Sequence, residues 1–199
     1  MALLSDKVAI VTGSTKGIGL SIAKIFSKHG ANVVVTSRSL DIAKNIVEDL
    51  SSYGTDSMAL KTDVSKTDSV TNLVKTVIDH YDKIDILINN AALQPVTMIA
   101  ELTAIEVQEM LHVNLRAPML LTRDFAKTKG TGGAVINICS IEALSPAIGH
   151  SHYAATKAGL LQFTRAAAVE LGIKNIRVNA ICPGLIDRDG LSTNWPEGF

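Results

Sequence analysis

The stretch KVAIVTGSTKGIG, residues 7–19, decides the fold. Its first half, residues 7–12, is a short apolar run rich in β-branched side chains, which predicts a buried strand. Three glycines follow in the spacing G-x-x-x-G-x-G, and residues 20–28 then place apolar side chains at helical spacing. Such a strand, turn and helix suit a phosphate group, because glycine lets the backbone come close and a helix N-terminus offers free N–H groups. A plain tight turn into a helix is the alternative that this stretch leaves open.

The rest of the chain repeats this alternation of apolar strands and amphipathic helices. We expect strands over residues 7–12, 31–36, 57–62, 84–88, 134–139 and 176–181, and helices over residues 20–28, 40–52, 68–80, 103–127 and 152–171. The fourth of these helices is interrupted at Pro118, and residues 130–133 form a turn. The alternation predicts a single α/β domain over residues 1–199, with a parallel sheet that helices cover on both faces. Ligands of such sheets bind beyond the carboxyl ends of the strands.

Composition narrows the function classes. The 199 residues suffice for one core, and 19 basic residues balance 19 acidic ones, so no overall field draws the chain to nucleic acid or an anionic membrane. We predict no signal peptide, no membrane span and no metal site. Cys139 and Cys182 each lie in an apolar run and resemble small buried hydrophobes. We therefore expect a reduced, cytoplasmic protein, although the sequence leaves a disulfide between the two cysteines open.

A second motif, SIEALSPAIGHSHYAATK, covers residues 140–157. Tyr153 and Lys157 are four residues apart in helix-favouring sequence, so their side chains lie on one helical face, one turn apart. Two unit charges about 4 Å apart, at an effective dielectric near 20, interact by about 4 kcal/mol, or roughly three pKa units. The ammonium would thus bring the pKa of the Tyr153 phenol, normally about 10, towards neutrality. A solvated helical face is the alternative for an isolated Y-x-x-x-K.

The end of the second expected strand bears on the choice of cofactor. In a dinucleotide-binding fold an acidic residue there binds the 2′-hydroxyl of NAD, whereas an Arg accommodates the 2′-phosphate of NADP. The stretch between Asn32 and Leu40 contains no Asp or Glu, but it contains Arg38 and Ser39. Lys16 in the glycine turn adds a second cation. We therefore expect NADP(H) rather than NAD(H), with solvated surface charges as the alternative.

These motifs together resemble those of the short-chain dehydrogenase/reductase family of the classical type. The matching set, in the family's order and spacing, is T-G-x-x-x-G-I-G from Thr12 to Gly19, Asp63, Asn89-Asn90-Ala91, Asn114, Ser140, Tyr153-x-x-x-Lys157 and Pro183-Gly184. The resemblance covers essentially the whole chain. It implies a Rossmann-type, doubly wound sheet with strand order 3-2-1-4-5-6. It also implies an oxidoreductase that interconverts a carbonyl and a secondary alcohol by hydride transfer with NADP(H).

The resemblance assigns roles by position. Tyr153 would be the acid/base at the substrate oxygen, Ser140 would position that oxygen, and Lys157 would bind the nicotinamide ribose and lower the pKa of Tyr153. Asn114 would hold a water that links Lys157 to solvent. The expected cofactor-binding residues are Gly13, Ser14, Thr15, Lys16, Gly17, Ile18, Gly19, Arg38, Ser39, Asp63, Val64, Asn90, Ala91, Tyr153, Lys157, Pro183 and Gly184. The expected substrate-lining residues, for which a solvated loop is the alternative, are Gln94, Glu142, His150 and Trp195.

The chain departs from the family pattern near its end. The family has a Thr four residues past the glycine of Pro183-Gly184, where this sequence has Arg188, so we assign no contact to the cofactor carboxamide. Family members continue through a further helix and a seventh strand, so we expect a truncated domain. The resemblance also implies a homodimer or homotetramer through the helices over residues 103–127 and 152–171. The alternative function is a catalytically silent dinucleotide-binding or redox-sensing protein, against which the complete Ser, Tyr, Lys and Asn set argues.

Overall fold

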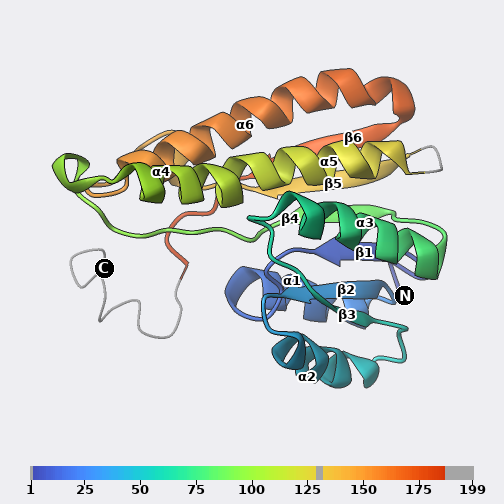
Figure 1. The fold of residues 1–199 in the computed structure, drawn as a ribbon. Helices are drawn as coiled ribbons and strands as arrows, with labels where there is room; N and C mark the ends of the chain where they lie inside the picture. The colour runs from blue at the N-terminus through green and yellow to red at the C-terminus, as the bar shows by residue number, and fades with distance from the viewer. Residues whose placement is uncertain (1, 129–131, 187–199) are drawn as a thin grey trace.

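In the computed structural model (Figure 1), residues 2–128 and 132–186 are described. The strands are β1 (Val8–Val11), β2 (Asn32–Ser37), β3 (Met58–Lys61), β4 (Ile86–Asn89), β5 (Gly133–Ile138) and β6 (Ile176–Ile181). The helices are α1 (Gly17–Lys28), α2 (Leu40–Ser51), α3 (Thr67–Tyr81), α4 (Ala104–Leu111), α5 (Ala117–Lys127) and α6 (Ser151–Leu171). A π-helical turn, His112–Arg116, joins α4 to α5. Short 3-10 turns cover Ile99–Glu101, Ile141–Ala143 and Gly172–Lys174.

The strands form a parallel sheet in the order β3-β2-β1-β4-β5-β6, which confirms the expected topology. Ala9 of β1 lies beside Val33 of β2 on one side and Ile86 of β4 on the other. The strand order therefore changes direction between β1 and β4. In an open α/β sheet, the carboxyl ends of the strands on the two sides of such a switch form the ligand crevice.

Two apolar clusters hold the helices on opposite faces of the sheet. On one face, side chains of α3, α5 and α6 pack against Val8 and Ile10 of β1. On the other face, side chains of α1 and α2 pack against Val33 and Val35 of β2. Each fully buried aliphatic side chain contributes about 1.5–3 kcal/mol, so this double coverage explains why the strands are apolar on both faces. In the described part of the chain, none of the helices is long and apolar enough to cross a membrane.

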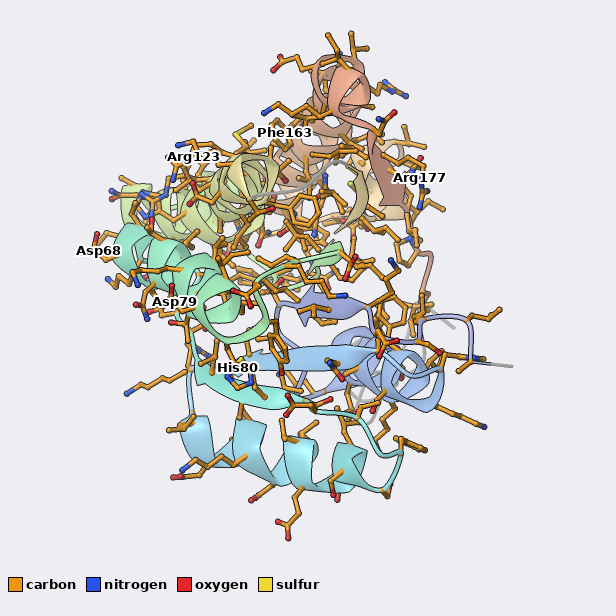
Figure 2. The ribbon with its side chains drawn as sticks, turned by 90° about the vertical axis from the view of Figure 1, so that its right-hand side faces the viewer. Asp68, Asp79, His80, Arg123, Phe163 and Arg177 are labelled. Atoms are coloured by element: carbon orange, nitrogen blue, oxygen red, sulfur yellow. The ribbon has the colours of Figure 1, made fainter. Side chains whose placement is uncertain are left out.

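Figure 2 shows charged side chains on the outer surfaces of the helices and of β6. Asp68 and Asp79 of α3 and Arg123 of α5 lie on the outer surface. On β6, Ile176 and Val178 are buried, whereas the alternate residues, among them Arg177, are exposed. Within the described residues, helices therefore cover β6 on only one face.

Two expected helix boundaries were wrong, both for local reasons. Helix α1 begins at Gly17 rather than at residue 20, because the last glycines of the turn already belong to its first turn. The long fourth helix is interrupted over His112–Arg116, before Pro118 rather than at it. Pro118 has no N–H, so the ordinary helical bond to the carbonyl of Asn114 cannot form, and the preceding turn widens. Pro118 itself lies in the first turn of α5, where its missing donor is tolerated.

The glycine turn fits closely between β1 and the end of β4. Gly13 and Gly17 adopt left-handed backbone angles, with φ of 63° and 52°. A Cβ at Gly19 would lie 2.4 Å from the Gly13 carbonyl oxygen and 2.4 Å from Nδ2 of Asn90. These positions need glycine for backbone geometry and for space.

Hydrogen bonds fix the turn to the neighbouring strand. The Thr12 hydroxyl accepts hydrogen bonds from the backbone N–H groups of Asn90 (2.9 Å) and Ala91 (3.0 Å). The amide of Asn90 donates in return to the carbonyls of Thr12 (2.9 Å) and Gly13 (3.1 Å). The first two loops of the crevice are therefore held as one unit.

The substitution Gly19→Ala tests this close fit. We expect it to lower the free energy of unfolding by about 1–3 kcal/mol, because the added methyl group must displace backbone or the Asn90 amide. Urea unfolding monitored by circular dichroism measures the change. Gly172→Ala is the matched control, since a Cβ there meets nothing within 4 Å and the backbone is helical, with φ of −56°. Equal stability of the two variants would show that the turn is not tightly packed.

Candidate active site

The centre of the candidate site is a buried pair on α6, Tyr153 and Lys157, which are 6% and 3% exposed. The ammonium nitrogen of Lys157 lies 5.6 Å from the centroid of the Tyr153 ring. The predicted one-turn spacing is therefore present, and the solvated-face alternative does not hold. Lys157 Nζ also donates a 2.7 Å hydrogen bond to the carbonyl of Ile138 on β5. Burial, which disfavours the charged form, lowers the pKa of Lys157 to about 8.

Ser140 enters the same region from the carboxyl end of β5. It is 8% exposed, and its hydroxyl oxygen accepts a 3.1 Å hydrogen bond from the backbone N–H of Glu142. The 3-10 turn that it caps packs against α6. The carbonyl of Pro183, just past β6, accepts a 2.9 Å hydrogen bond from the N–H of Ile141 in this turn. The ends of β5 and β6 therefore meet beside α6.

Asn114 braces the site through its side chain. Its Oδ1 accepts from the N–H of Leu93 and its Nδ2 donates to the carbonyl of Leu93, both at 2.8 Å. The same Nδ2 lies 3.3 Å from the hydroxyl of Thr156, which donates to the carbonyl of Tyr153. The amide therefore ties the loop after β4 to α6 and is committed to that role. The main-chain carbonyl of Asn114, which Pro118 cannot bond, is the remaining polar group of this residue.

The glycine turn has the shape and the donors that a dinucleotide phosphate needs. Gly13, Gly17 and Gly19 leave the backbone open where side chains would otherwise fill the space. Within the described chain, the first turn of α1 carries no acidic side chain, and exposed Lys16 precedes it. The unpaired N–H groups of that turn favour an anion. These residues therefore fit the pyrophosphate of a nicotinamide dinucleotide.

The remaining predicted residues of this turn differ in how they face the crevice. The hydroxyl of Ser14 points inwards, donating to the carbonyl of Val11 (2.8 Å) and accepting from the N–H of Thr36 (2.9 Å). Ser14 thus holds the turn against β2, and only its backbone is available to a ligand. Thr15 and Ile18 are half-buried.

Arg38 and Asp63 lie close together beyond the neighbouring strands β2 and β3. Arg38 is exposed just past β2, between half-buried Ser37 and Ser39. Burial raises the pKa of the Asp63 carboxyl. Two hydrogen bonds from Ser65 and the charges of Lys66 and Arg38 lower that pKa by more, so the net shift is downwards. The side chain of Asp63 is thus partly committed to its own loop, next to half-buried Val64.

The three described residues expected to line the substrate site form one cluster. The buried carboxylate of Glu142 accepts hydrogen bonds from Nδ1 of His150 (2.9 Å) and from Nε2 of Gln94 (3.2 Å). The His150 ring lies edge-on to the Tyr153 ring, with centroids 5.8 Å apart. The solvated-loop alternative therefore does not hold for Glu142 and His150. Trp195, Arg188 and residues 130–131 of the expected turn lie outside the described residues, and the last residue of that turn, Gly133, begins β5.

The two cysteines differ in exposure and follow neighbouring strands. Cys139 is buried, but Cys182 is only half-buried, and the two lie side by side beyond β5 and β6. Their proximity could have been predicted from the expected strand order, because each cysteine directly follows one of two neighbouring strands, β5 and β6.

Comparisons with known proteins agree with this geometry. The family model described as short chain dehydrogenase matches residues 7–197. The 3-oxoacyl-[acyl-carrier-protein] reductase FabG of Chlamydia muridarum is 38% identical over 207 residues, covering 99% of this chain and 84% of the relative. Dehydrogenase/reductase SDR family member 4 of Homo sapiens is 39% identical, covering 98% and 71%.

Solved structures give the same result. A short chain dehydrogenase from Burkholderia cenocepacia in complex with NADP superimposes with a TM-score of 0.89 at 34% identity, covering 94% of this chain and 77% of that one. Fold, motif order and sequence similarity therefore coincide along nearly the full length. The chain belongs to the short-chain dehydrogenase/reductase family.

Proposed function

We propose that the protein is an NADP(H)-dependent oxidoreductase that interconverts a carbonyl and a secondary alcohol, with Tyr153 as acid and base. The observation that carries the proposal is the buried Tyr153–Lys157 pair, which lies beside Ser140 at the carboxyl edge of the sheet. The oxidoreductase class follows from the family. The names of several relatives, 3-oxoacyl-[acyl-carrier-protein] reductase, support reduction of a carbonyl.

Each of the three side chains has a distinct task. Ser140 accepts from the N–H of Glu142, which leaves its own O–H to donate to the substrate oxygen. Tyr153 gives that oxygen a proton in reduction and takes it back in oxidation. A pKa of about 8 keeps Lys157 mainly protonated at neutral pH, so its charge favours the phenolate form of Tyr153. When bound, the nicotinamide cofactor supplies or accepts the hydride.

Asn114 is the residue that we expect to connect Lys157 to solvent for proton transfer. Because its amide is committed to Leu93, we propose that its main-chain carbonyl holds the water that links Lys157 to solvent. The wide turn over His112–Arg116 and the missing N–H of Pro118 support this, since they leave the carbonyl without its ordinary helical donor. In this role Asn114 has a backbone function in proton transfer and a side-chain function in bracing.

The substrate pocket is expected to have a polar wall made of Gln94, Glu142 and His150. The buried carboxylate of Glu142 holds its two donors together, and one of them, His150, lies edge-on to the Tyr153 ring. This arrangement favours a substrate with a polar group, such as a further hydroxyl, near the reacting carbonyl.

Arg38 supports a preference for NADP(H). It is exposed at the end of β2 in a stretch without carboxylates, and Lys16 lies in the glycine turn. The solved relative with bound NADP is consistent with this choice.

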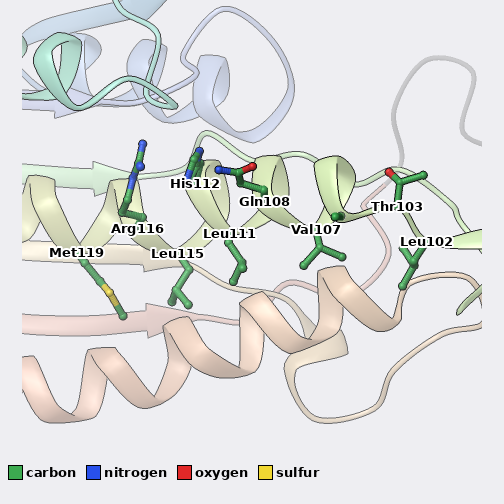
Figure 3. A pocket seen from close by; sticks show the side chains of 10 residues that line it. Leu102, Thr103, Val107, Gln108, Leu111, His112, Leu115, Arg116 and Met119 are labelled. Carbon is green, nitrogen blue, oxygen red and sulfur yellow. The ribbon is translucent and has the colours of Figure 1, made fainter.

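We also propose a homodimer through α4, α5 and α6. Figure 3 shows a pocket along α4 and α5, in which the apolar side chains project towards α6 in this view. These side chains are Leu102, Val107, Leu111, Leu115 and Met119. A second copy that presents the same surface would cover it by twofold symmetry.

Tyr153→Phe tests the catalytic assignment. The variant keeps the ring but loses the transferable proton, so kcat should fall by about 10²–10⁴-fold while NADPH affinity is largely kept. Oxidation of NADPH with a panel of ketones, followed by absorbance, measures turnover, and fluorescence titration measures binding. Turnover near the wild-type rate would refute the role of Tyr153. Absence of turnover in the wild-type chain as well would favour the catalytically silent alternative.

Arg38→Ala tests the cofactor assignment. A lost charge-assisted contact of about 1.5–3 kcal/mol should weaken NADPH binding by roughly 10–100-fold and leave NADH binding almost unchanged. Parallel titrations with both cofactors provide the comparison, and Lys28→Ala, an exposed cation at the other end of α1, is the control. Tighter binding of NADH than NADPH by the wild-type protein would overturn the preference.

Leu111→Glu tests the homodimer. Leu111 is 43% exposed in the pocket of Figure 3, so a buried charge at the twofold contact should convert a dimer into a monomer. Light scattering coupled to size exclusion reports the mass. Ile25→Glu, at a similarly exposed apolar position on α1, should leave the mass unchanged. A monomeric wild-type protein would contradict the proposal.

A further inference from the structure

Two thiols lie next to each other at the end of the sheet. Ile138 of β5 is in register with Ile181 of β6, so Cys139 and Cys182 form the next pair along the two strands. The N–H of Cys139 donates a 2.8 Å hydrogen bond to the carbonyl of Ile181, which extends the ladder to this point. Side chains at matched positions of neighbouring parallel strands point to the same face.

That face is the one covered by α6. Asn137, two residues before Cys139, reaches the hydroxyl of Thr164 on α6 with a 2.8 Å hydrogen bond. By the alternation of the strand, Cys139 points the same way. The Cys139 and Cys182 thiols are close enough for each to influence the pKa of a common neighbour, Lys157, and Cys182 also influences the pKa of Cys139. Both are free thiols in this structure.

The spacing suits a covalent bond. Neighbouring strands run about 4.8 Å apart, and disulfides need Cα atoms about 4.4–6.8 Å apart. Bond formation between Cys139 and Cys182 therefore requires side-chain rotation and a small adjustment of the strand ends rather than refolding.

We propose that Cys139 and Cys182 are a redox modification site, which a hydroperoxide converts into a reversible disulfide. The Cys182 thiolate attacks one peroxide oxygen; the O–O bond breaks, an alcohol or water leaves, and Cys182 becomes a sulfenic acid. The Cys139 sulfur then attacks the Cys182 sulfur; the S–O bond breaks and water leaves. The two thiols together lose two electrons and two protons, and the peroxide is reduced.

The order of the two steps follows from exposure. Cys182 is half-buried and meets the oxidant first, whereas Cys139 is 3% exposed. Burial also raises the pKa of Cys139 to about 11, which makes it slow to react with the oxidant directly. Cys139 can still react with the sulfenic acid of Cys182, because the two sulfurs are neighbours.

The modification has a consequence that depends on the proposed function. Cys139 precedes Ser140 and Cys182 precedes Pro183, and a disulfide brings their sulfurs to about 2.05 Å. Lys157 is hydrogen-bonded to the carbonyl of Ile138, next to Cys139, and lies near both sulfurs. A movement of the strand ends should therefore displace its ammonium group as well. Displacing a catalytic group by about 1 Å lowers rates by about 10²-fold. Oxidation should therefore inactivate the enzyme reversibly, by about that factor.

Hydrogen peroxide treatment with mass spectrometry tests the site without relying on activity. The intact wild-type protein should lose the mass of two hydrogen atoms, peptide mapping should link Cys139 to Cys182, and dithiothreitol should reverse both changes. Cys139→Ser should show no link and should accumulate oxygen on Cys182. Wild-type protein that accumulates sulfinic or sulfonic acid on Cys182 without a link would overturn the proposal.

Activity measurements then separate this inference from the proposed function. Wild-type turnover should fall on oxidation and recover with dithiothreitol, whereas Cys139→Ser, which cannot form the link, should lack the loss of turnover that the disulfide causes. A link that forms in a protein whose reduced form has no reductase activity would contradict the proposed function and leave the modification site standing. A link that forms without any loss of turnover would overturn the inactivation.

Discussion

The hydrogen bond from Lys157 to the carbonyl of Ile138 is the interaction on which the rest of the site depends. Burial of a lysine is costly, and the pKa of about 8 is the measure of that cost here. The bond places the amine between the end of β5 and the Tyr153 ring and fixes α6 against the sheet. Without it, the phenol would have neither a nearby charge nor a defined position relative to Ser140.

The parallel sheet supplies the second constraint. Because the strand order changes direction between β1 and β4, the loops after these strands must share one crevice. Thr12 and Asn90 join those loops by reciprocal hydrogen bonds, and Asn114 ties the loop after β4 to α6. The expected cofactor and the expected substrate thus meet on a framework whose parts are braced against one another.

Much of this was predictable from the sequence, because it rests on local signals. Apolar runs located the six strands, and the family resemblance gave their order. What failed depends on packing between distant segments. The sequence does not show that the Ser14 hydroxyl points inwards and accepts a hydrogen bond from β2. Nor does it show that the helical turn before Pro118 widens. It also leaves open whether Glu142 and His150 are solvated, because only the folded chain shows that they are buried together.

The central claim is that buried Lys157 makes Tyr153 an acid and base near neutral pH. A titration of tyrosine labelled with 13C at Cζ, followed by NMR, tests this directly, because the chain has only three tyrosines and burial raises the pKa of Tyr81. With NADP bound, the pKa of Tyr153 should lie well below the ordinary value of about 10 and should rise by roughly three units in Lys157→Met. A Tyr153 pKa at or above about 10 that is the same in Lys157→Met would contradict the account.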